Sequence, residues 1–181
     1  MCDKNADDAM IRNDYETSIQ LHHMFLDKEP GNALALYHLG YSYGLTGDHP
    51  REVFYYEKAA ELGLREEMLF FNMGMAYGEL DQEQKAVNAF KKALKINPNN
   101  AENHYGLALG YKMVLEDKLA EKEFLRAIEI DPKHVDARLS LSLLYADWGD
   151  LQKASEALRE ILKIDPNNMT VLEFLKKIER E

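Results

Sequence analysis

A helix-ending motif that recurs at one fixed spacing is the feature of this chain that most restricts its fold. Proline stands at positions 98, 132 and 166, each 34 residues after the last, and two further steps back reach Pro30. Proline cannot continue the helical hydrogen-bond ladder, and the Asn or Asp before each of the three can bond locally. A period of this length indicates stacked supersecondary units rather than one globular core.

Each period contains two predicted helices, because its apolar residues recur at helical spacing. The first helices contain LYHLGYSYGLTGD, FFNMGMAYGELDQ, HYGLALGYKMVLED and RLSLSLLYADWGD, and the second helices contain EVFYYEKAAEL, KAVNAFKKALKI, LAEKEFLRAIEI and LQKASEALREILKI. Small residues are expected where the two helices approach closely: Gly40, Gly74, Ala108 and Ser142 in the first, and Ala86, Ala120 and Ala154 in the second.

This pattern resembles the tetratricopeptide repeat, with its 34 residues, its Leu-Gly and later Tyr in the first helix, and its closing Asp-Pro-Asn-Asn. The resemblance implies an all-α fold, a right-handed α-solenoid of antiparallel helix pairs with a C-terminal capping helix. The expected divisions are residues 1–32 (an acidic N-terminal segment with a partial repeat), full repeats at 33–66, 67–100, 101–134 and 135–168, and the capping helix at 169–181.

The sequence departs from the repeat pattern at several places. Glu52 occupies the small-residue site of the first full repeat, so the stacking of residues 45–66 is the part that the pattern predicts least well. Val114 and Leu115 replace a Gly-Asp turn and predict exposed apolar surface, and residues 1–12 are too short and acidic to predict a helix. In the capping helix, Lys176, Lys177, Glu179, Arg180 and Glu181 are expected to face water, with Val171, Leu172 and Leu175 covering the apolar end.

Composition excludes several classes of function. The formal charge of -10 and the pI near 5.1 argue against a nucleic-acid partner, because phosphate binding needs clustered Lys and Arg. The single cysteine, Cys2, cannot form an internal disulfide. With no signal segment and no long apolar stretch in the sequence, we expect no membrane insertion and a cytoplasmic protein.

The sequence predicts no enzyme and no cofactor. Gly40-Tyr41-Ser42-Tyr43-Gly44 spells the G-x-S-x-G of hydrolases, but it lies inside a predicted helix instead of a strand-to-helix turn. His22 and His23 are adjacent and point about 100° apart on a helix, so they do not share a metal ion easily. The other histidines occupy different repeat positions, and no metal site is expected.

The resemblance implies that the first helices line a concave, partner-binding face. The residues expected to line this groove are Tyr37, His38, Tyr41, Phe71, Asn72, Met75, Tyr105, Leu109, Lys112, Leu139 and Leu143. Exposed aromatic and methionine side chains favour a site for a helical or extended partner segment. The alternative is that these side chains only contact neighbouring first helices.

One familiar ligand of the family can be tested by position. The sites at which chaperone-binding members hold a terminal carboxylate carry Tyr37, Tyr41, Asn72, Glu102 and Gly106 here, and only Asn72 matches. We therefore expect no chaperone tail to bind through this clamp, although Asn72 remains a candidate for holding the backbone of another peptide.

Two function classes follow. The first is a non-catalytic adaptor that binds a protein or peptide of unknown identity in the groove. The second is a self-assembling scaffold, since residues 1–32 carry seven acidic and three basic groups and a basic cluster lies on one second helix. That cluster also fits a solvated outer face with lysines near the negative end of the helix dipole: Lys85, Lys91, Lys92 and Lys95.

Overall fold

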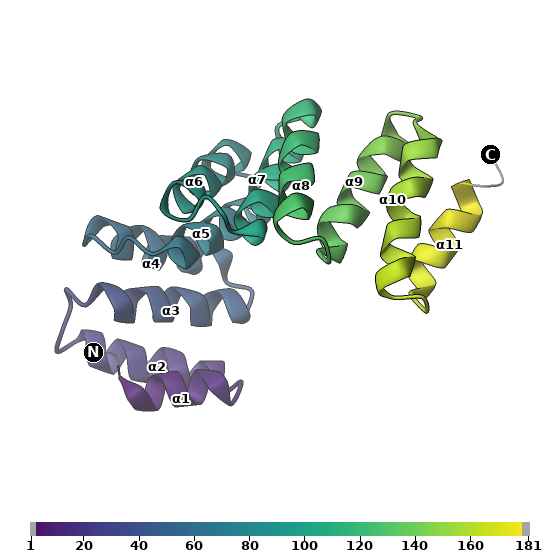
Figure 1. The fold of residues 1–181 in the computed structure, drawn as a ribbon. Helices are drawn as coiled ribbons and strands as arrows, with labels where there is room; N and C mark the ends of the chain where they lie inside the picture. Colours follow the sequence, from purple (N-terminus) through teal and green to yellow (C-terminus); the bar gives the residue numbers. More distant parts are fainter. Residues whose placement is uncertain (1–2, 179–181) are drawn as a thin grey trace. The chain divides into compact units, whose positions relative to one another are not determined.

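The computed structural model describes residues 3–178, and these form eleven α-helices and no strand. The all-α solenoid class predicted from the repeats is confirmed, and the helices are drawn in Figure 1. Their bounds are α1 Lys4–Ile11, α2 Tyr15–Leu26, α3 Ala33–Leu45, α4 His49–Glu61, α5 Glu67–Glu79, α6 Glu83–Ile96, α7 Ala101–Met113, α8 Asp117–Ile130, α9 Val135–Asp147, α10 Leu151–Ile164 and α11 Met169–Ile178.

The chain divides into two compact units, Met1–Asn97 and Pro98–Glu181. In the first unit the pairs α1/α2, α3/α4 and α5/α6 pack internally, and each pair also contacts the next. In the second unit α7/α8 and α9/α10 form the pairs, and α11 packs on α10. The larger interfaces lie between helices adjacent in sequence, and α3 also contacts α5, the first helix of the next pair, as expected for an array that is stabilised repeat by repeat.

Helix α1 is a feature that the sequence did not predict. Its N-terminus is capped by Asp3, whose side chain accepts hydrogen bonds from the backbone N–H groups of Asn5 and Ala6. Ala6 and Ala9 are fully buried and allow α1 to lie close to α2. Asp3 and Asp7, two of the acidic residues because of which no helix was expected here, therefore stabilise it, since negative charge is favourable at the N-terminal end of a helix.

The turn inside every helix pair has the same backbone geometry. One residue per turn adopts a left-handed conformation with φ between 52° and 79°. The residue after it donates its backbone N–H to the carbonyl five positions before itself, which closes the helix end. These left-handed residues are Asn13, Gly47, Asp81, Leu115 and Gly149, each 34 positions after the last. The structural period therefore extends to the α1/α2 pair.

The packing inside the pairs confirms the small-residue pattern. A Cβ added to Gly40 would stand 2.7 Å from Cδ1 of Tyr56, and one added to Gly74 would stand 2.6 Å from Cε1 of Phe90. The later small positions, Ala108 and Ser142, are fully buried, as are Ala86, Ala120 and Ala154 on the second helices. The first-helix residue thus leaves room for a large side chain from the second helix.

Helix α11 closes the second unit. Val171 is buried, Leu172 and Leu175 are half-buried, and Lys176 and Lys177 are exposed, as expected for a capping helix. Glu179, Arg180 and Glu181 lie outside the described residues. None of the described helices has both the length and the apolar character needed to cross a bilayer.

Candidate functional site

The first predicted column of groove residues packs largely within its own repeats. The Tyr37 ring lies 5.5 Å from that of Tyr56, and the Phe71 ring lies 5.7 Å from that of Phe90. In the second unit the equivalent ring pair, Tyr105 and Phe124, is 6.0 Å apart, and Leu139 packs against the same core. Burial raises the pKa of Tyr37 to about 12. These side chains of the first helices therefore pack into the interior of their units and present only part of their surface to solvent.

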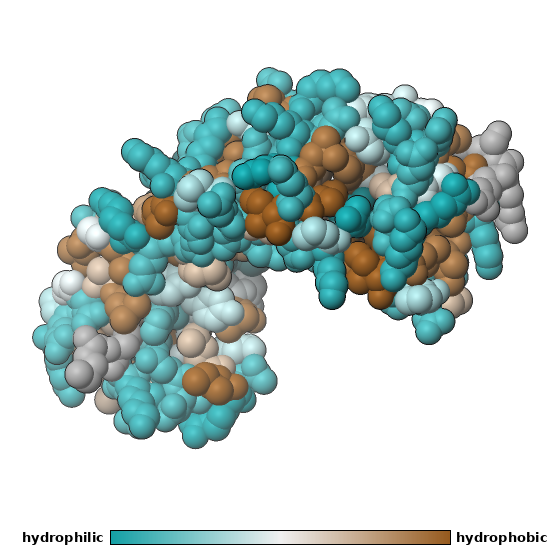
Figure 2. Space-filling model, in the orientation of Figure 1, coloured by the Kyte–Doolittle hydropathy of each residue, from teal (hydrophilic) through white to brown (hydrophobic). Residues whose placement is uncertain are grey.

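The second predicted column, one helical turn later, is more open. Tyr41 is 37% exposed, Met75 41% and Leu143 45%, whereas Leu109 is half-buried against the core of the second unit. Apolar side chains reach the surface of both units in the space-filling view (Figure 2). The exposed members of this column are the residues that a partner can reach without moving the core.

The polar groove candidates already have partners. Asn72 donates from Nδ2 to the Tyr37 hydroxyl at 3.1 Å, which joins α5 to α3. Lys112 Nζ lies 3.1 Å from Asp147 Oδ2 within the second unit. A peptide that used the Asn72 amide would have to share or replace the bond to Tyr37.

A hollow of about 210 Å³ opens between α3 and α5 in the first unit, beside the two exposed second-column residues of that unit. Tyr41 and Met75 line it, with Asn72 between them and two carboxylates, Glu52 and Glu79, on its wall. None of the described residues that line it is Lys or Arg. The hollow therefore combines apolar surface with negative charge.

Glu52 explains both the missing small residue and part of that charge. Its carboxyl group is buried where a Cβ on Gly44 would stand, 2.5 Å from Oε1, so Gly44 makes the space that the large side chain needs. Oε2 accepts a hydrogen bond from His49 Nδ1 at 2.8 Å, if that ring nitrogen carries the proton. Burial raises the pKa of Glu52 despite this bond, and the Glu79 charge adds to the shift.

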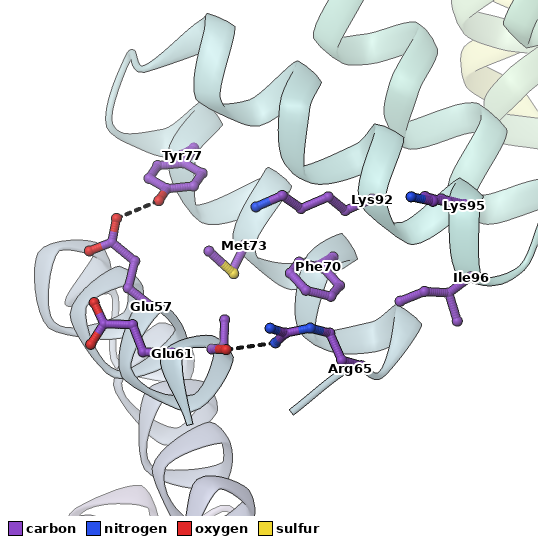
Figure 3. Close-up of a pocket in the computed structure, with 10 residues that line it drawn as sticks. Glu57, Glu61, Arg65, Phe70, Met73, Tyr77, Lys92, Lys95 and Ile96 are labelled. Atoms are coloured by element: carbon purple, nitrogen blue, oxygen red, sulfur yellow. Dashed lines mark hydrogen bonds between the residues drawn. The ribbon is translucent and has the colours of Figure 1, made fainter. Parts of the chain in front are cut away.

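A second pocket, of about 790 Å³, lies among α4, α5 and α6, and the repeat pattern of the sequence does not predict it. Figure 3 shows Glu57 and Glu61 facing Phe70, Met73 and Lys92 across its opening. The Tyr77 hydroxyl donates to Glu57 Oε1 at 2.6 Å at one edge. The signal in the sequence was the basic cluster on α6, since Lys92 and Lys95 border this pocket instead of belonging only to a solvated face.

The hydrolase-like serine is not an accessible nucleophile. Ser42 is fully buried in α3, where its Oγ donates to the His38 carbonyl at 3.0 Å and lies 3.0 Å from Ser18 Oγ. A substrate has no path to this hydroxyl group without separation of α2 from α3. The literal motif is therefore explained by helix packing.

The histidines are less dispersed than the sequence suggested. His22 and His38 approach one another together with Asp7, so that one ligand atom from each lies within 4.8 Å of the others. Their different repeat positions did not reveal this approach, because it arises from the stacking of α3 on α2, which brings residues 16 positions apart to one site. Among the described residues this is the group with metal-ligand geometry.

The comparisons with known proteins agree with the repeat architecture. Models of the tetratricopeptide repeat match residues 33–62, 68–100 and 135–168. No curated protein matches the sequence.

Several solved structures share the fold. A MamA structure is 23% identical, with a TM-score of 0.84 over 91% of this chain and 96% of its own. YrrB, described as a TPR protein with an unusual peptide-binding site, is 24% identical, with a TM-score of 0.82 over 94% of this chain and 88% of its own. A MamA chain from Desulfovibrio magneticus RS-1 is 18% identical, with a TM-score of 0.85 over 90% of this chain and 92% of its own.

Proposed function

Because this chain belongs to the tetratricopeptide-repeat family, we propose that it is a non-catalytic adaptor that binds a helical or extended segment of a partner protein on its first helices. Proteins of this family generally mediate protein–protein interactions. The proposal adds a location and a ligand chemistry to that general role.

The observation that carries the proposal is the hollow between α3 and α5. Tyr41 and Met75 remain exposed beside it although the rings of the neighbouring column are packed away. Aromatic and methionine side chains are enriched at the centres of protein interfaces, where their burial supplies much of the binding energy. An apolar side chain of the partner would enter this hollow.

The charge of the hollow restricts the partner further. Glu79 is exposed at its wall, and Glu52 lies behind it with its charge disfavoured by burial. A Lys or Arg next to the apolar anchor of the partner would pair with Glu79, whereas an acidic neighbour would be repelled. We therefore assign to the hollow a segment that combines an apolar residue with a basic one.

The second unit would present a further part of the binding surface. Leu143 is the exposed apolar residue of α9 at the corresponding repeat position. Tyr105, Leu109 and Leu139 pack, partly buried, against the core of this unit. Lys112 adds a positive charge beside its Asp147 partner. We expect this unit to make an apolar contact with the partner at a surface that carries less net negative charge than the hollow of the first unit.

Selection of displayed peptides on the intact protein tests the proposal. Replacing the aromatic column would confuse binding with folding, because those rings pack on Tyr56 and Phe90. The informative variants are Tyr41→Ala, Met75→Ala and Glu79→Gln, which alter exposed side chains. Each should weaken binding of the selected peptides by about fivefold or more, since losing an anchor costs about 1 kcal/mol or more.

Matched controls are available on other surfaces of the first unit. Phe54 on α4 and Met24 on α2 are exposed apolar residues outside the hollow. Phe54→Ala and Met24→Ala should bind the peptides as the wild type does. If the peptides bind the Tyr41→Ala, Met75→Ala double variant with unchanged affinity, the hollow is not the binding site.

Self-assembly is the alternative, and the pocket of Figure 3 is the observation that favours it. Lys92 and Lys95 on its border offer positive charge that the acidic N-terminal segment of a second molecule could meet. Sedimentation over a range of protein concentrations distinguishes the two functions. A mass that rises with concentration, and falls in Lys92→Glu, would support the scaffold.

A further inference from the structure

Within the described part of the chain, the imidazole of His22 on α2 is buried without hydrogen bonds. Its side chain is 0% exposed, yet neither ring nitrogen has a hydrogen-bond partner among the described residues. A buried polar group left without a partner costs about 1–3 kcal/mol, so native structures rarely retain one without a reason. A role in binding a metal ion is one such reason.

Two other ligand-type side chains converge on this imidazole. His22 Nε2 lies 3.7 Å from Oδ1 of Asp7, which comes from α1. The same oxygen lies 2.6 Å from His38 Nδ1, which comes from α3. The two histidine rings meet edge to face, with centroids 5.8 Å apart. Three consecutive helices therefore each contribute one ligand atom to the same small volume.

We propose that Asp7, His22 and His38 bind one divalent transition-metal ion, with Zn²⁺ as the best fit. Two imidazoles and one carboxylate form a ligand set that zinc commonly uses, whereas Ca²⁺ and Mg²⁺ prefer sites made entirely of oxygen. Zinc bonds of about 2.0–2.2 Å in a tetrahedral arrangement place the ligand atoms roughly 3.4 Å apart. The Asp7–His38 pair would open slightly, and the Asp7–His22 pair would close slightly.

The partial exposure of the site suits metal exchange. The Asp7 side chain is 28% exposed and the His38 side chain 21%, so an ion can enter from the solvent side while His22 closes the site from within. A water molecule on the open side would complete four-coordination.

Binding of the ion would hold α1 in place against its neighbouring helices. Helix α1 has eight residues, of which Ala6 and Ala9 are buried, so it contributes little apolar surface to hold itself in place. An ion joined to Asp7, His22 and His38 would fasten α1 to both α2 and α3. Because the ion would bind the folded arrangement and not the separated helices, it would stabilise the N-terminal end of the first unit.

Titration of the intact, tag-free protein tests the site after treatment with EDTA and removal of the chelator. Calorimetry with ZnCl₂ should show one ion per chain, and CoCl₂ should give the visible absorption of tetrahedral Co²⁺. Asp7→Asn and His38→Gln remove ligands at the partly exposed side of the site, so neither substitution alters a fully buried side chain. Each should weaken binding about tenfold or more and abolish the rise in melting temperature caused by zinc.

His104→Gln is the matched control. His104 Nδ1 lies 2.6 Å from Glu123 Oε2, the same separation as the His38–Asp7 pair, but no third ligand belongs to that pair among the described residues. The control should retain wild-type binding. The proposal is overturned if the wild type shows no saturable binding, if Asp7→Asn and His38→Gln bind as it does, or if His104→Gln loses binding equally.

Discussion

Gly74 on α5 faces the ring of Phe90 on α6 so closely that an added Cβ would stand 2.6 Å from its Cε1. Phe90 is fully buried and belongs to the packed interior of its repeat, so the ring has little room to move away. The same relation links Gly40 to Tyr56 one repeat earlier. The separation of the two helices in each pair thus depends on one small residue.

Gly74→Ala should lower the free energy of unfolding by about 1–3 kcal/mol, because overpacking forces the helices or the ring to shift. Urea denaturation followed by circular dichroism measures the change. Gly31→Ala is the control, since a Cβ there would meet no atom within 4 Å. Equal stability of the two variants would show that the close contact does not constrain the pair.

Leu115→Gly should have the opposite effect. Leu115 is 86% exposed and has φ of 59°, at a position where two of the equivalent turns have glycine. Replacement removes the strain of a left-handed leucine without losing packing, and we expect a gain of about 0.5–1 kcal/mol.

Leu125→Gly provides the contrast to that substitution. Leu125 is also an exposed leucine, but it lies within α8, where glycine costs about 1 kcal/mol. Thermal and urea denaturation of the two variants should therefore move in opposite directions. A loss of stability in both would mean that the turn does not strain Leu115.

Stability should also depend on the protonation of Glu52. Burial raises the pKa of this carboxyl group in the folded state, opposed by His49 and reinforced by Glu79. Above its folded pKa the buried charge therefore costs stability, and that cost disappears as the pH falls through the folded pKa towards the value of the unfolded chain.

Glu52→Gln should accordingly be more stable than the wild type at neutral pH, with a difference that shrinks as the solution is acidified. Urea denaturation at a series of pH values measures this difference. Glu79→Gln changes a carboxylate of the same hollow that is exposed, and should show a smaller effect. A constant difference between wild type and Glu52→Gln at every pH would contradict the assignment.

The sequence by itself determined the helix pairs and their period. The left-handed turn residues, from Asn13 to Gly149, and the small residues facing Tyr56 and Phe90 recur every 34 positions because each repeat solves the same local packing problem. Helix α1 escaped prediction because its apolar surface is little more than Ala6 and Ala9, too weak a pattern to recognise without the helices beneath it.

Only the tertiary structure decided which residues can meet a ligand. Tyr37 and Tyr41 are one helical turn apart and share a face by period, yet Tyr37 packs on Tyr56 and Tyr41 stays exposed, because the second helix covers only part of that face. Likewise Asp7, His22 and His38 converge through the stacking of three helices. Helical periodicity specifies which side of a helix a residue occupies, whereas the neighbours it meets depend on how the helices pack.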